Sequence, residues 1–578
     1  MALLALLPPL LSIITTVAAL LATYIFYRLF LYTPFFSPLR HIPGPPKEHV
    51  VYGNMPSIVR EPPGLLHTQW SEKYGGVVKY SGVFSEDRLL FTDPVALNHI
   101  FSHAYDFPKP QDVRGELARI LGKGILFAEG DDHKRQKKVM NPAFSPSHLR
   151  NIAPTFFECT YKLRDKFHEL IESSTSDPSC FASDASFATY ESTKPSGEIV
   201  LNISTWLSRV TLDVIGQAGF GYSFGAVEGQ TTVLAAAFQK MFAAGGTKKP
   251  LTPFWITVGR GLGKLLTVMP VDISGWLPID RLKRLKAGLE ALENESAKIV
   301  QERKRVVEAE GEESLTSSKD LMSLLLRSNI SGDPKTMLTD AELQGQMTTM
   351  LLAGHETSGT SLTWLLWRLS QNPKIQDRLR AEVRAARRAA IQAGRDEISS
   401  DELESLEYLD AVVREILRLE SPAPATIRTP LKDELIPLGT PVLSPNGDTL
   451  TSVVVPAGSV LFLSIAAVNK SKKTWGEDAE EFRPERWLEG KIEGGVGVYS
   501  HILTFLAGPR ACIGYKFALL EIKTILAVLI DDFAFAEREP GLEIERRSAL
   551  VMRSLVKGEE HLGFRMPLRM SLAPKDDE

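Results

Sequence analysis

Apolar residues recur about every 3.6 positions through the middle and C-terminal parts of the chain, which is the period of an α-helix with one buried face. Segments typical of β-strands are few, and they fall at residues 77–80, 89–91, 453–455 and 460–463. The pattern therefore predicts a mainly α fold with a minor β-sheet.

One predicted helix is much longer than the rest. Thr339 and Glu342 form the pattern of a capping box, in which two side chains satisfy backbone N–H groups at the start of a helix. The helical period continues to Asn372-Pro373, where proline ends it. At ~1.5 Å per residue, about 32 residues make a helix ~48 Å long, enough to cross a whole domain. Two further helices are predicted at residues 401–419 and 515–528.

The N-terminal segment has a different pattern. No charged residue occurs before Arg28, and residues 10–32 are almost wholly apolar, which is long enough to span a bilayer. A cleaved secretory signal is the alternative, but such a signal normally begins with basic residues, and this segment does not. We therefore expect an uncleaved, single-pass transmembrane anchor at residues 1–33.

The residues after the anchor predict its orientation. Three basic residues precede the first acidic residue, Glu48, and basic residues beside an anchor favour a cytosolic location for the chain that follows. The run His-Ile-Pro-Gly-Pro-Pro at residues 41–46 cannot be helical. We expect a proline-rich hinge at residues 34–50 and one catalytic domain at residues 51–578, because no later linker is long enough to separate two domains.

The composition is that of an ordinary globular protein, with 44% hydrophobic and 24% charged residues. Basic and acidic residues nearly balance, 66 against 70, so the charge gives no reason to expect nucleic-acid binding. Three cysteines in 578 residues exclude a disulfide-stabilised scaffold. The sequence has no glycine-rich flavin or dinucleotide motif and no cysteine cluster for iron and sulfur. Any electrons that this protein uses must therefore come from a separate protein.

Three sequence patterns carry candidate chemistry, and the first lies inside the long helix. Ala353 and Gly354 remove side-chain bulk from one face, and glycine within a helix costs ~1 kcal/mol relative to alanine unless something needs the space. We infer that a bulky group lies there. Glu356 and Thr357 then place a carboxylate and a hydroxyl among apolar residues. The alternative is a kinked helix in which the Thr357 hydroxyl bonds to a carbonyl of its own helix.

The second pattern is Glu-Ile-Leu-Arg at residues 415–418, on a predicted helix. Glu415 and Arg418 lie three positions apart, so they share a helix face and can form an ion pair. A solvated surface pair is the alternative, but the neighbouring apolar residues favour a buried one. A buried pair needs further hydrogen-bond partners, and Arg486 in Phe-Arg-Pro-Glu-Arg-Trp is a candidate.

The third pattern is the loop Phe-Leu-Ala-Gly-Pro-Arg-Ala-Cys-Ile-Gly at residues 505–514, followed by a predicted helix. A thiolate at Cys512 would be stabilised by the N–H groups and the dipole of that helix, as a metal ligand must be. Gly508 and Gly514 would let a flat cofactor approach the backbone, and Arg510 suits a carboxylate. A lone cysteine is usually a small buried hydrophobe, but that alternative does not explain five specified residue types in ten positions.

The order Ala-Gly-x-Glu-Thr, Glu-x-x-Arg, Pro-Glu-Arg and Phe-x-x-Gly-x-Arg-x-Cys-x-Gly resembles the haem-thiolate monooxygenases of the cytochrome P450 superfamily. The resemblance covers essentially all of the chain after the hinge. It implies the P450 fold, haem b, and insertion of one oxygen atom from O₂ into a substrate. The anchor and hinge resemble the microsomal type, which implies the endoplasmic reticulum membrane with a cytosolic catalytic domain. The segment between residues 428 and 455 resembles fungal members, and the expected setting is secondary metabolism.

The resemblance assigns chemical roles to five residues. Cys512 matches the axial thiolate ligand of the haem iron, which favours O–O bond cleavage. Phe505 and Gly514 match residues that shield this sulfur and permit haem approach. Glu356 and Thr357 match the pair that delivers protons to bound dioxygen.

Other residues are expected to hold the haem or the fold. Arg428 and Arg510 match positions that bind the haem propionates. Where many members have Trp-x-x-x-Arg, this chain has His133 and Lys137, and lysine lacks the bidentate geometry of arginine. The remaining expected positions are haem contacts at Ala353, Gly354 and Gly508 and a structural triad beneath the haem formed by Glu415, Arg418 and Arg486.

The resemblance also implies redox partners. Electrons would come from NADPH through a membrane-bound NADPH-cytochrome P450 reductase, with cytochrome b5 as a further candidate donor. Lys134, Arg135, Lys137 and Lys138 form a candidate docking face for an acidic partner, and a solvated helix face is the alternative.

Two other functions are compatible with these motifs. One is a haem-thiolate isomerase or dehydratase that acts on a preformed peroxide, and the other is a catalytically silent haem or sterol carrier. The Glu356-Thr357 pair argues against the first, because such enzymes have less need of a proton relay.

The expected substrate is a lipophilic small molecule of the terpenoid, sterol or fatty acid class. The resemblance places residues 112–127 and 424–426, together with Ala353 and Gly354, around a largely apolar pocket. Residues 241–268 mix aromatic, aliphatic and basic side chains. They are expected to form either an access port at the bilayer surface or an ordinary helix-packing face.

Overall fold

The computed structural model describes residues 2–176, 197–230, 280–310, 320–330, 337–490, 495–548 and 551–575. The described residues form two compact units. Unit 1 contains the residues up to Pro110 together with Ala425–Ser471, and unit 2 contains the rest. The segment 241–268 lies outside the described residues, and a single catalytic domain from residue 51 stays a prediction.

Unit 1 is built around a four-stranded sheet in the order β1-β2-β7-β4. Strands β2 and β7 are parallel, and the other neighbours are antiparallel. A separate antiparallel hairpin pairs β5 with β6. The strands are β1 (Val77–Ser81), β2 (Asp87–Phe91), β4 (Ala425–Arg428), β5 (Glu434–Leu443), β6 (Thr449–Val455) and β7 (Val460–Ser464), and the helices after the N-terminal segment are α2 (Met55–Arg60), α3 (Leu65–Tyr74), α4 (Pro94–Ser102) and α18 (Ile465–Asn469).

All four predicted strand segments are confirmed, because they fall within β1, β2, β6 and β7. The sequence did not predict β5. This strand contains Pro437 and Pro441, which cannot donate to a neighbouring strand, and its register with β6 shifts between Pro437 and Val442. A hairpin at the edge of a unit tolerates these prolines, whereas a central strand does not.

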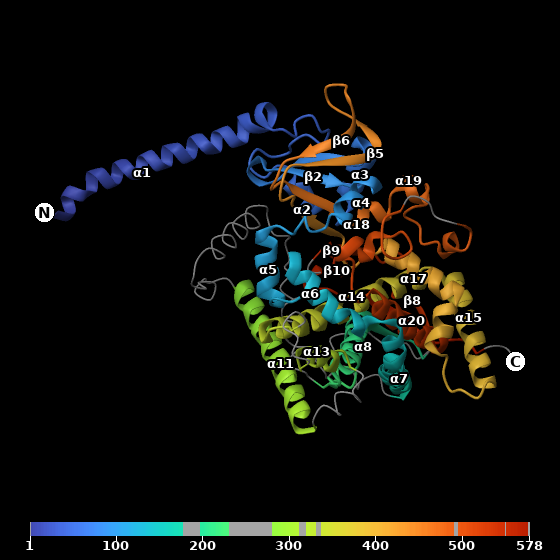
Figure 1. Ribbon diagram of the computed structural model, residues 1–578. Coiled ribbons are helices and arrows are strands. Elements are labelled where there is room, and N and C mark those ends of the chain that lie inside the picture. Colours follow the sequence, from blue (N-terminus) through green and yellow to red (C-terminus); the bar gives the residue numbers. More distant parts are fainter. Residues whose placement is uncertain are drawn as a thin grey trace. The chain divides into compact units, whose positions relative to one another are not determined.

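The N-terminal apolar segment is helical, but it extends beyond the predicted anchor. Helix α1 (Ala2–Phe26) continues into the π-helical segment η1 (Tyr27–Phe36), so the helical segment ends at Phe36 instead of residue 33. Within it, Thr15–Tyr32 is long and apolar enough to cross a membrane, and none of it is buried. Figure 1 shows α1 extending away from the rest of unit 1.

The proline-rich segment is non-helical, as predicted, but it packs against unit 1. The Pro43 carbonyl accepts the Lys79 N–H of β1 at 2.9 Å, and the Pro46 carbonyl accepts the Asn54 side-chain amide at 2.7 Å. A Cβ on Gly44 would overlap the Lys79 carbonyl oxygen. Only glycine fits at this approach, so the end of the predicted hinge is part of the folded unit.

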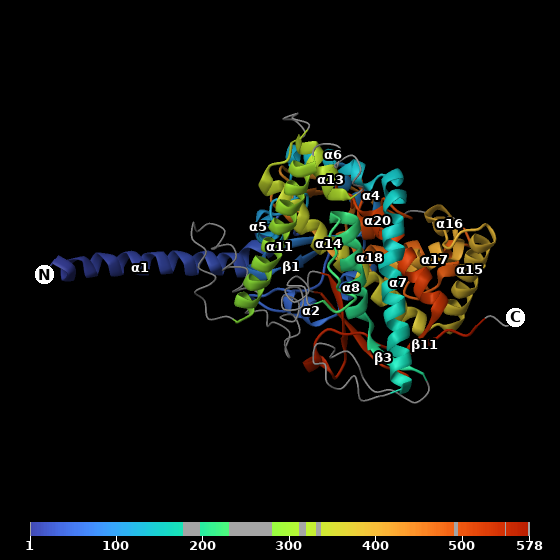
Figure 2. The same cartoon turned by 90° about the horizontal axis from the view of Figure 1, so that it is seen from below.

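Unit 2 is mainly helical, and α14 (Asp340–Ser370) runs through it. The predicted capping box is confirmed: the Glu342 N–H donates to Thr339 Oγ1 at 3.2 Å, and the Thr339 N–H donates to Glu342 Oε2 at 2.9 Å. Most side chains of α14 are buried, so the helix lies inside the core. Figures 1 and 2 show α14 beside α8 (Ile203–Val214), and α14 also packs on α20 (Tyr515–Asp532).

The rest of the described part of unit 2 consists of two small sheets and further helices. Strands β3 (Ile199–Asn202), β11 (Pro567–Leu572) and β8 (Phe533–Glu537) form a sheet in that order, and β9 (Ile544–Ser548) pairs with β10 (Met552–Val556). The remaining α-helices are α5 (Gln111–Leu121), α6 (Gly130–Met140), α7 (Pro146–Ser176), α11 (Asp280–Glu310), α13 (Leu321–Ile330), α15 (Pro373–Gln392), α16 (Ser400–Ser405), α17 (Glu407–Leu419) and α19 (Lys472–Trp475).

The predicted helix at residues 401–419 is in fact two helices. Helix α16 ends at Ser405, and Leu406 is extended with φ −69° and ψ 109° before α17 begins. Glu382 of α15 accepts the Tyr408 and Leu409 N–H groups at 2.8 Å each. This capping carboxylate comes from another helix, so the local period could not reveal the break.

Glu521 of α20 is a carboxyl group inside the core. Its side chain is fully buried, and neither carboxyl oxygen has a hydrogen-bond partner among the described residues. Burial raises the pKa of Glu521 to about 8, and the nearby Ser358 hydroxyl of α14 offsets only part of this rise. Glu521 is therefore protonated at neutral pH.

We expect Glu521→Gln to flatten the pH dependence of stability. Between pH ~5 and pH 8 the folded chain holds a proton on Glu521 that the unfolded chain has lost, so stability falls as the pH rises, by up to ~1.4 kcal/mol per pH unit. Glutamine carries no such proton. The free energy of unfolding of the variant, relative to the wild type, should rise from pH 5 to 8 and level off above it. Urea unfolding at each pH measures this difference, and a constant difference contradicts the assignment.

Candidate active site

The loop before α20 holds Cys512 in a defined turn. The Cys512 N–H donates to the Phe505 carbonyl at 2.9 Å, and Gly508 has φ +63°, a conformation that other residues adopt only with strain. The turn alone requires glycine at position 508, and contact between Gly508 and a haem stays a prediction. A Cβ on Gly514 would touch only the Phe144 ring, at an ordinary 3.6 Å. Packing within the described chain therefore does not explain Gly514.

The Cys512 side chain is accessible, yet much protein surrounds its sulfur. A sulfur that faces an interior space accounts for both observations. Burial raises the pKa of the Cys512 thiol above its ordinary value, and the Gly514 N–H and the Lys137 ammonium offset only part of this rise. Those two groups are the ones that stabilise a thiolate.

The Cys159 thiol on α7 is fully buried, and burial raises its pKa to about 12, so it stays a neutral core residue.

The basic residues expected at the haem propionates have partners within unit 2. Arg510 pairs with Glu129 and donates to the Ala128 carbonyl at 2.7 Å. Lys137 donates to the Pro509 carbonyl at 2.6 Å. These bonds join α6 and the residues before it to the Cys512 loop. Propionate binding by Arg510 and Lys137 stays a prediction.

The two other expected propionate donors lie apart in the sequence. His133 is buried on α6, one turn before Lys137. Arg428 belongs to unit 1, where its guanidinium donates to Thr426 Oγ1 at 2.6 Å and to the Ile427 carbonyl at 2.7 Å. Their contacts with a haem also stay predictions.

Gly354 of α14 packs closely against another part of the chain. A Cβ on Gly354 would lie 2.9 Å from a side-chain carbon of Ile215, in the π-helical segment η6 (Ile215–Gly219) that follows α8. Ile215 is therefore one bulky group beside Gly354, and haem contact at Ala353 and Gly354 stays a prediction. Thr357 donates its hydroxyl to the Ala353 carbonyl at 2.7 Å, which is the back-bonded arrangement given above as the alternative.

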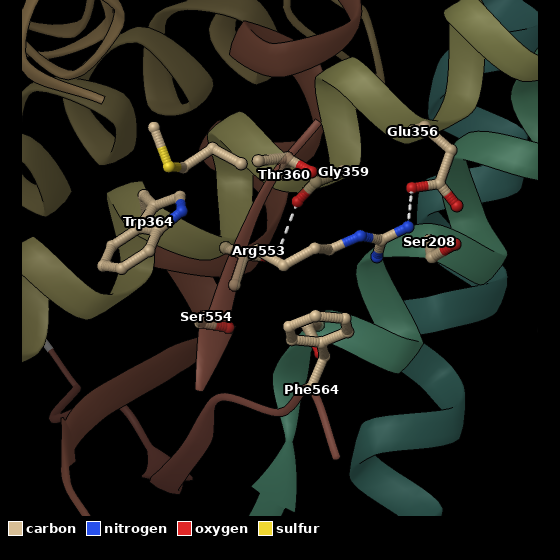
Figure 3. A pocket seen from close by; sticks show the side chains of 11 residues that line it. Ser208, Glu356, Gly359, Thr360, Trp364, Arg553, Ser554 and Phe564 are labelled. Carbon is tan, nitrogen blue, oxygen red and sulfur yellow. Dashed lines mark hydrogen bonds and ion pairs between the residues drawn. The ribbon is translucent and has the colours of Figure 1, made fainter. Parts of the chain in front are cut away.

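Glu356 is buried and points into a pocket in unit 2. Figure 3 shows its carboxylate meeting the guanidinium of Arg553, which reaches across from β10. His355 Nε2 lies 3.2 Å from Glu356 Oε1. Burial favours the neutral acid, but Arg553 and His355 outweigh it and hold the pKa of Glu356 below its ordinary value. Glu356 is thus a carboxylate at neutral pH.

Glu415, Arg418 and Arg486 form one buried network. Arg418 donates to both carboxylate oxygens of Glu415, at 2.8 and 2.9 Å, and Arg486 Nε donates to Glu415 Oε1 at 2.9 Å. Trp487 Nε1 donates to Glu415 Oε2 at 2.9 Å, and the Arg483 N–H donates to Oε1 at 3.0 Å. A buried ion pair is stable only when such additional donors satisfy it.

Comparison with known proteins places the chain in a family. The cytochrome P450 family model matches residues 43–557, which include the Cys512 loop, α14 and the Glu415 network. The chain belongs to the cytochrome P450 family. Haem b is the cofactor of this family, and Cys512 fits it, because an accessible cysteine sulfur is the ligand that the iron of a haem-thiolate protein needs.

The relatives of this P450 are fungal monooxygenases. Cytochrome P450 monooxygenase 205 of Postia placenta is 36% identical over 540 residues, which cover 92% of each chain. Ganoderic acid synthetase of Ganoderma lucidum is 33% identical and covers 91% of this chain and 93% of its own. Cytochrome P450 monooxygenase claO of Ampulloclitocybe clavipes is 31% identical and covers 92% and 93%. This P450 is therefore a monooxygenase.

Sequence patterns did not reveal three partners of the site residues. Arg553, Glu129 and Trp487 bind Glu356, Arg510 and Glu415 respectively. Trp487 lies next to Arg486 in the motif that was recognised, so its position offered a signal. Arg553 is 197 residues from Glu356, and Glu129 is 381 residues from Arg510, so neither pairing leaves a local pattern.

We expect Glu415→Gln to destabilise unit 2 by about 3 kcal/mol or more, because the change removes the buried carboxylate that Arg418 and Arg486 share. Thermal unfolding and the haem content of the purified protein measure the effect. Arg150→Gln is the matched control, since the Arg150–Asp401 pair is exposed at both ends and should change little. Equal effects of the two changes contradict the structural role of the Glu415 network.

Proposed function

We propose that this P450 inserts one oxygen atom of O₂ into a lipophilic small molecule of the terpenoid, sterol or fatty acid class. The Cys512 loop carries the proposal, because its backbone turn, the Gly514 N–H and Lys137 suit an anionic sulfur ligand. One relative is named for ganoderic acid synthesis, and that name supports a role in secondary metabolism.

The haem, when bound, supplies the oxidising chemistry, and the residues of the chain prepare for it. Cys512 would hold the haem iron through its sulfur, and the Gly514 N–H and Lys137 would favour the charged form of that sulfur. The Thr357 hydroxyl, now bonded to the Ala353 carbonyl, passes a proton on from α14. Glu356 takes up that proton from solvent. The turn at Gly508 fixes the position of the Cys512 sulfur, so the loop does not need to become ordered during the reaction.

We propose that electrons come from NADPH through a separate NADPH-cytochrome P450 reductase, with cytochrome b5 as a second candidate donor. The docking face predicted on α6 is smaller than its sequence indicated. Arg135 pairs with Glu342, and Lys137 donates to the Pro509 carbonyl. The exposed residues Lys134 and Lys138 are left to attract an acidic partner, and Lys134 also pairs with Asp131.

The helix from α1 to η1 supports a single-pass anchor in the endoplasmic reticulum membrane, with the catalytic domain that follows it on the cytosolic side. Ile13, Val17 and Leu20 are all more than half exposed, and lipid would cover them at no desolvation cost.

Purified protein reconstituted with reductase, NADPH and O₂ should convert lipophilic test substrates to hydroxylated products. Cys512→Ala should abolish the conversion, whereas Cys159→Ala, which removes a core cysteine, should lose stability but keep chemistry. Product analysis with ¹⁸O₂ reports the source of the inserted atom. Turnover with a hydroperoxide and none with NADPH, reductase and O₂ would instead establish the peroxide isomerase alternative.

Alkaline carbonate should leave the full-length protein in the membrane pellet after expression in yeast, because an apolar helix that spans the bilayer resists extraction. A variant without residues 1–36 should move largely to the supernatant. Immunoblotting of both fractions measures the distribution, with the cytosolic orientation checked by protease access to intact microsomes. Release of the full-length protein argues against the anchor.

A further inference from the structure

Residues 122–129 connect α5 to α6, and this α5–α6 connection lies directly against α14. A Cβ on Gly345 of α14 would lie 2.5 Å from the Gly124 nitrogen, and a Cβ on Gly124 would lie 2.5 Å from the Gly345 carbonyl oxygen. Neither position has room for a side chain, so the two backbones are in contact. Glycine weakens the interior of a helix, and this contact explains its presence at position 345. Figure 1 shows α5, which leads into the connection, beside α14.

Two buried glutamines bind the α5–α6 connection. Gln346 of α14 accepts the Ile125 N–H at 3.0 Å and donates to Gln136 Oε1 of α6 at 2.7 Å. Gln136 Nε2 in turn donates to the Lys123 carbonyl at 3.3 Å and to Glu342 Oε1 at 2.9 Å. A backbone N–H can only donate, and a carbonyl or carboxylate can only accept, so the two amides have one consistent orientation. Both side chains are buried, so water does not compete for these bonds.

The other end of the connection is held at the Cys512 loop. Arg510 donates to the Ala128 carbonyl at 2.7 Å and pairs with Glu129. The α5–α6 connection thus extends from α14 to the loop that carries the candidate iron ligand. Its two ends are fixed by different partners, and the end at α14 depends on the two glutamines.

The residues between these two attachments have apolar side chains that the chain does not fully cover. Leu126 is 38% exposed, and Ile125 and Phe127 are only half-buried. The backbone is fixed nonetheless, by the bond to Gln346 and by the Phe127 N–H, which donates to the Gly124 carbonyl at 3.0 Å. Uncovered apolar side chains on a fixed backbone are typical of a preformed ligand pocket.

One buried hydroxyl opposes this arrangement. Thr349, one turn after Gly345 on α14, is buried, and its Oγ1 has no hydrogen-bond partner among the described residues. A Cβ on Gly124 would lie 2.8 Å from this oxygen, so the connection covers it. A covered hydroxyl without a partner disfavours the contact, because it has lost its bonds to water. The glutamine bonds must therefore outweigh this effect to keep the connection in place.

We propose that Gln346 is a positioning residue that holds the α5–α6 connection on α14 and so makes residues 125–127 a preformed wall for the lipophilic substrate. The identity of the ligand rests on the proposed monooxygenase function, whereas the holding contact does not. Gln346 acts through the Ile125 N–H and through Gln136, and it does not itself touch the substrate. With the wall in place, the substrate does not need to order these side chains when it binds.

Three variants of the full-length, haem-loaded protein test the holding contact. Gln346→Met keeps the length of the side chain and removes both hydrogen bonds. Gln344→Met is the matched control, since this glutamine lies on the same helix but donates to the Glu293 carbonyl of α11 at 3.4 Å. Thr349→Val keeps the shape of the side chain and removes the unpaired hydroxyl. The measurement is amide hydrogen exchange by mass spectrometry in residues 121–129, which needs neither substrate nor turnover.

Exchange in residues 121–129 should be roughly tenfold faster in Gln346→Met, because two buried hydrogen bonds are lost. It should be roughly fivefold slower in Thr349→Val, because the connection then covers no unpaired hydroxyl, and unchanged in Gln344→Met. Exchange in α20 is the internal reference and should be unchanged in all three. Equal rates in Gln346→Met and Gln344→Met, or an equal acceleration in α20, overturn the holding role of Gln346. Unchanged or faster exchange in Thr349→Val overturns the contact between the connection and α14 at this hydroxyl.

Two haem ligands of different size test the wall. Imidazole reaches only the iron, whereas 4-phenylimidazole adds an apolar ring that can contact residues 125–127. Optical titration of the ferric protein gives both dissociation constants. Gln346→Met should weaken 4-phenylimidazole about fivefold, because the ligand must then order the wall, and should leave imidazole unchanged. The same ratio of constants in the wild type and in Gln346→Met overturns the wall.

Should Gln346→Met fail to bind haem, Gly345→Ala decides the proposal by the same criteria. Alanine strengthens a helix, but its Cβ would push Gly124 away from α14, so exchange in the connection should again be faster. A protein that shows both effects but forms no oxygenated product refutes the proposed function and leaves the role of Gln346 intact.

Discussion

A charge inside a protein must be met by donors or by an opposite charge, and this constraint shapes every part of unit 2 that bears on chemistry. The Cys512 sulfur is approached by the Gly514 N–H and Lys137. Glu415 is enclosed by two arginines and an indole N–H, and Glu356 is held by Arg553. Glu521 has no such partner among the described residues, and it is the one of these acids that stays protonated.

The hydrogen bonds and ion pairs that neutralise these charges also connect segments that are far apart in the sequence. Lys137 and Pro509 are 372 residues apart, and Arg553 and Glu356 are 197 residues apart. Each contact joins an element that carries a reactive side chain to an element that has no reactive side chain of its own and holds the first in place. The Cys512 loop is thereby fixed from α6, and α14 is fixed from β10. Removal of one partner would leave a buried charge unmatched, so these contacts constrain the geometry of the Cys512 loop and of α14.

The sequence predicted the features that have local signals. The capping box at Thr339, the end of α14 before Asn372-Pro373, and the four strand segments each depend on residues within a few positions of one another. The break at Leu406, the packing of Ile215 against Gly354, and the Arg553 contact all depend on residues brought together by folding. The motifs therefore identified the reactive residues, while the partners that set their charge and direction became visible only in the structure.

The most direct test of this account is the optical spectrum of the reduced protein with carbon monoxide, which reports the ligand opposite the gas on the haem iron. The account predicts the spectrum of a thiolate-ligated haem for the wild type and for Cys159→Ala. It predicts loss of that spectrum for Cys512→Ala, and a spectrum typical of nitrogen ligation for Cys512→His. A thiolate spectrum that survives in Cys512→Ala would contradict the assignment of Cys512 as the iron ligand.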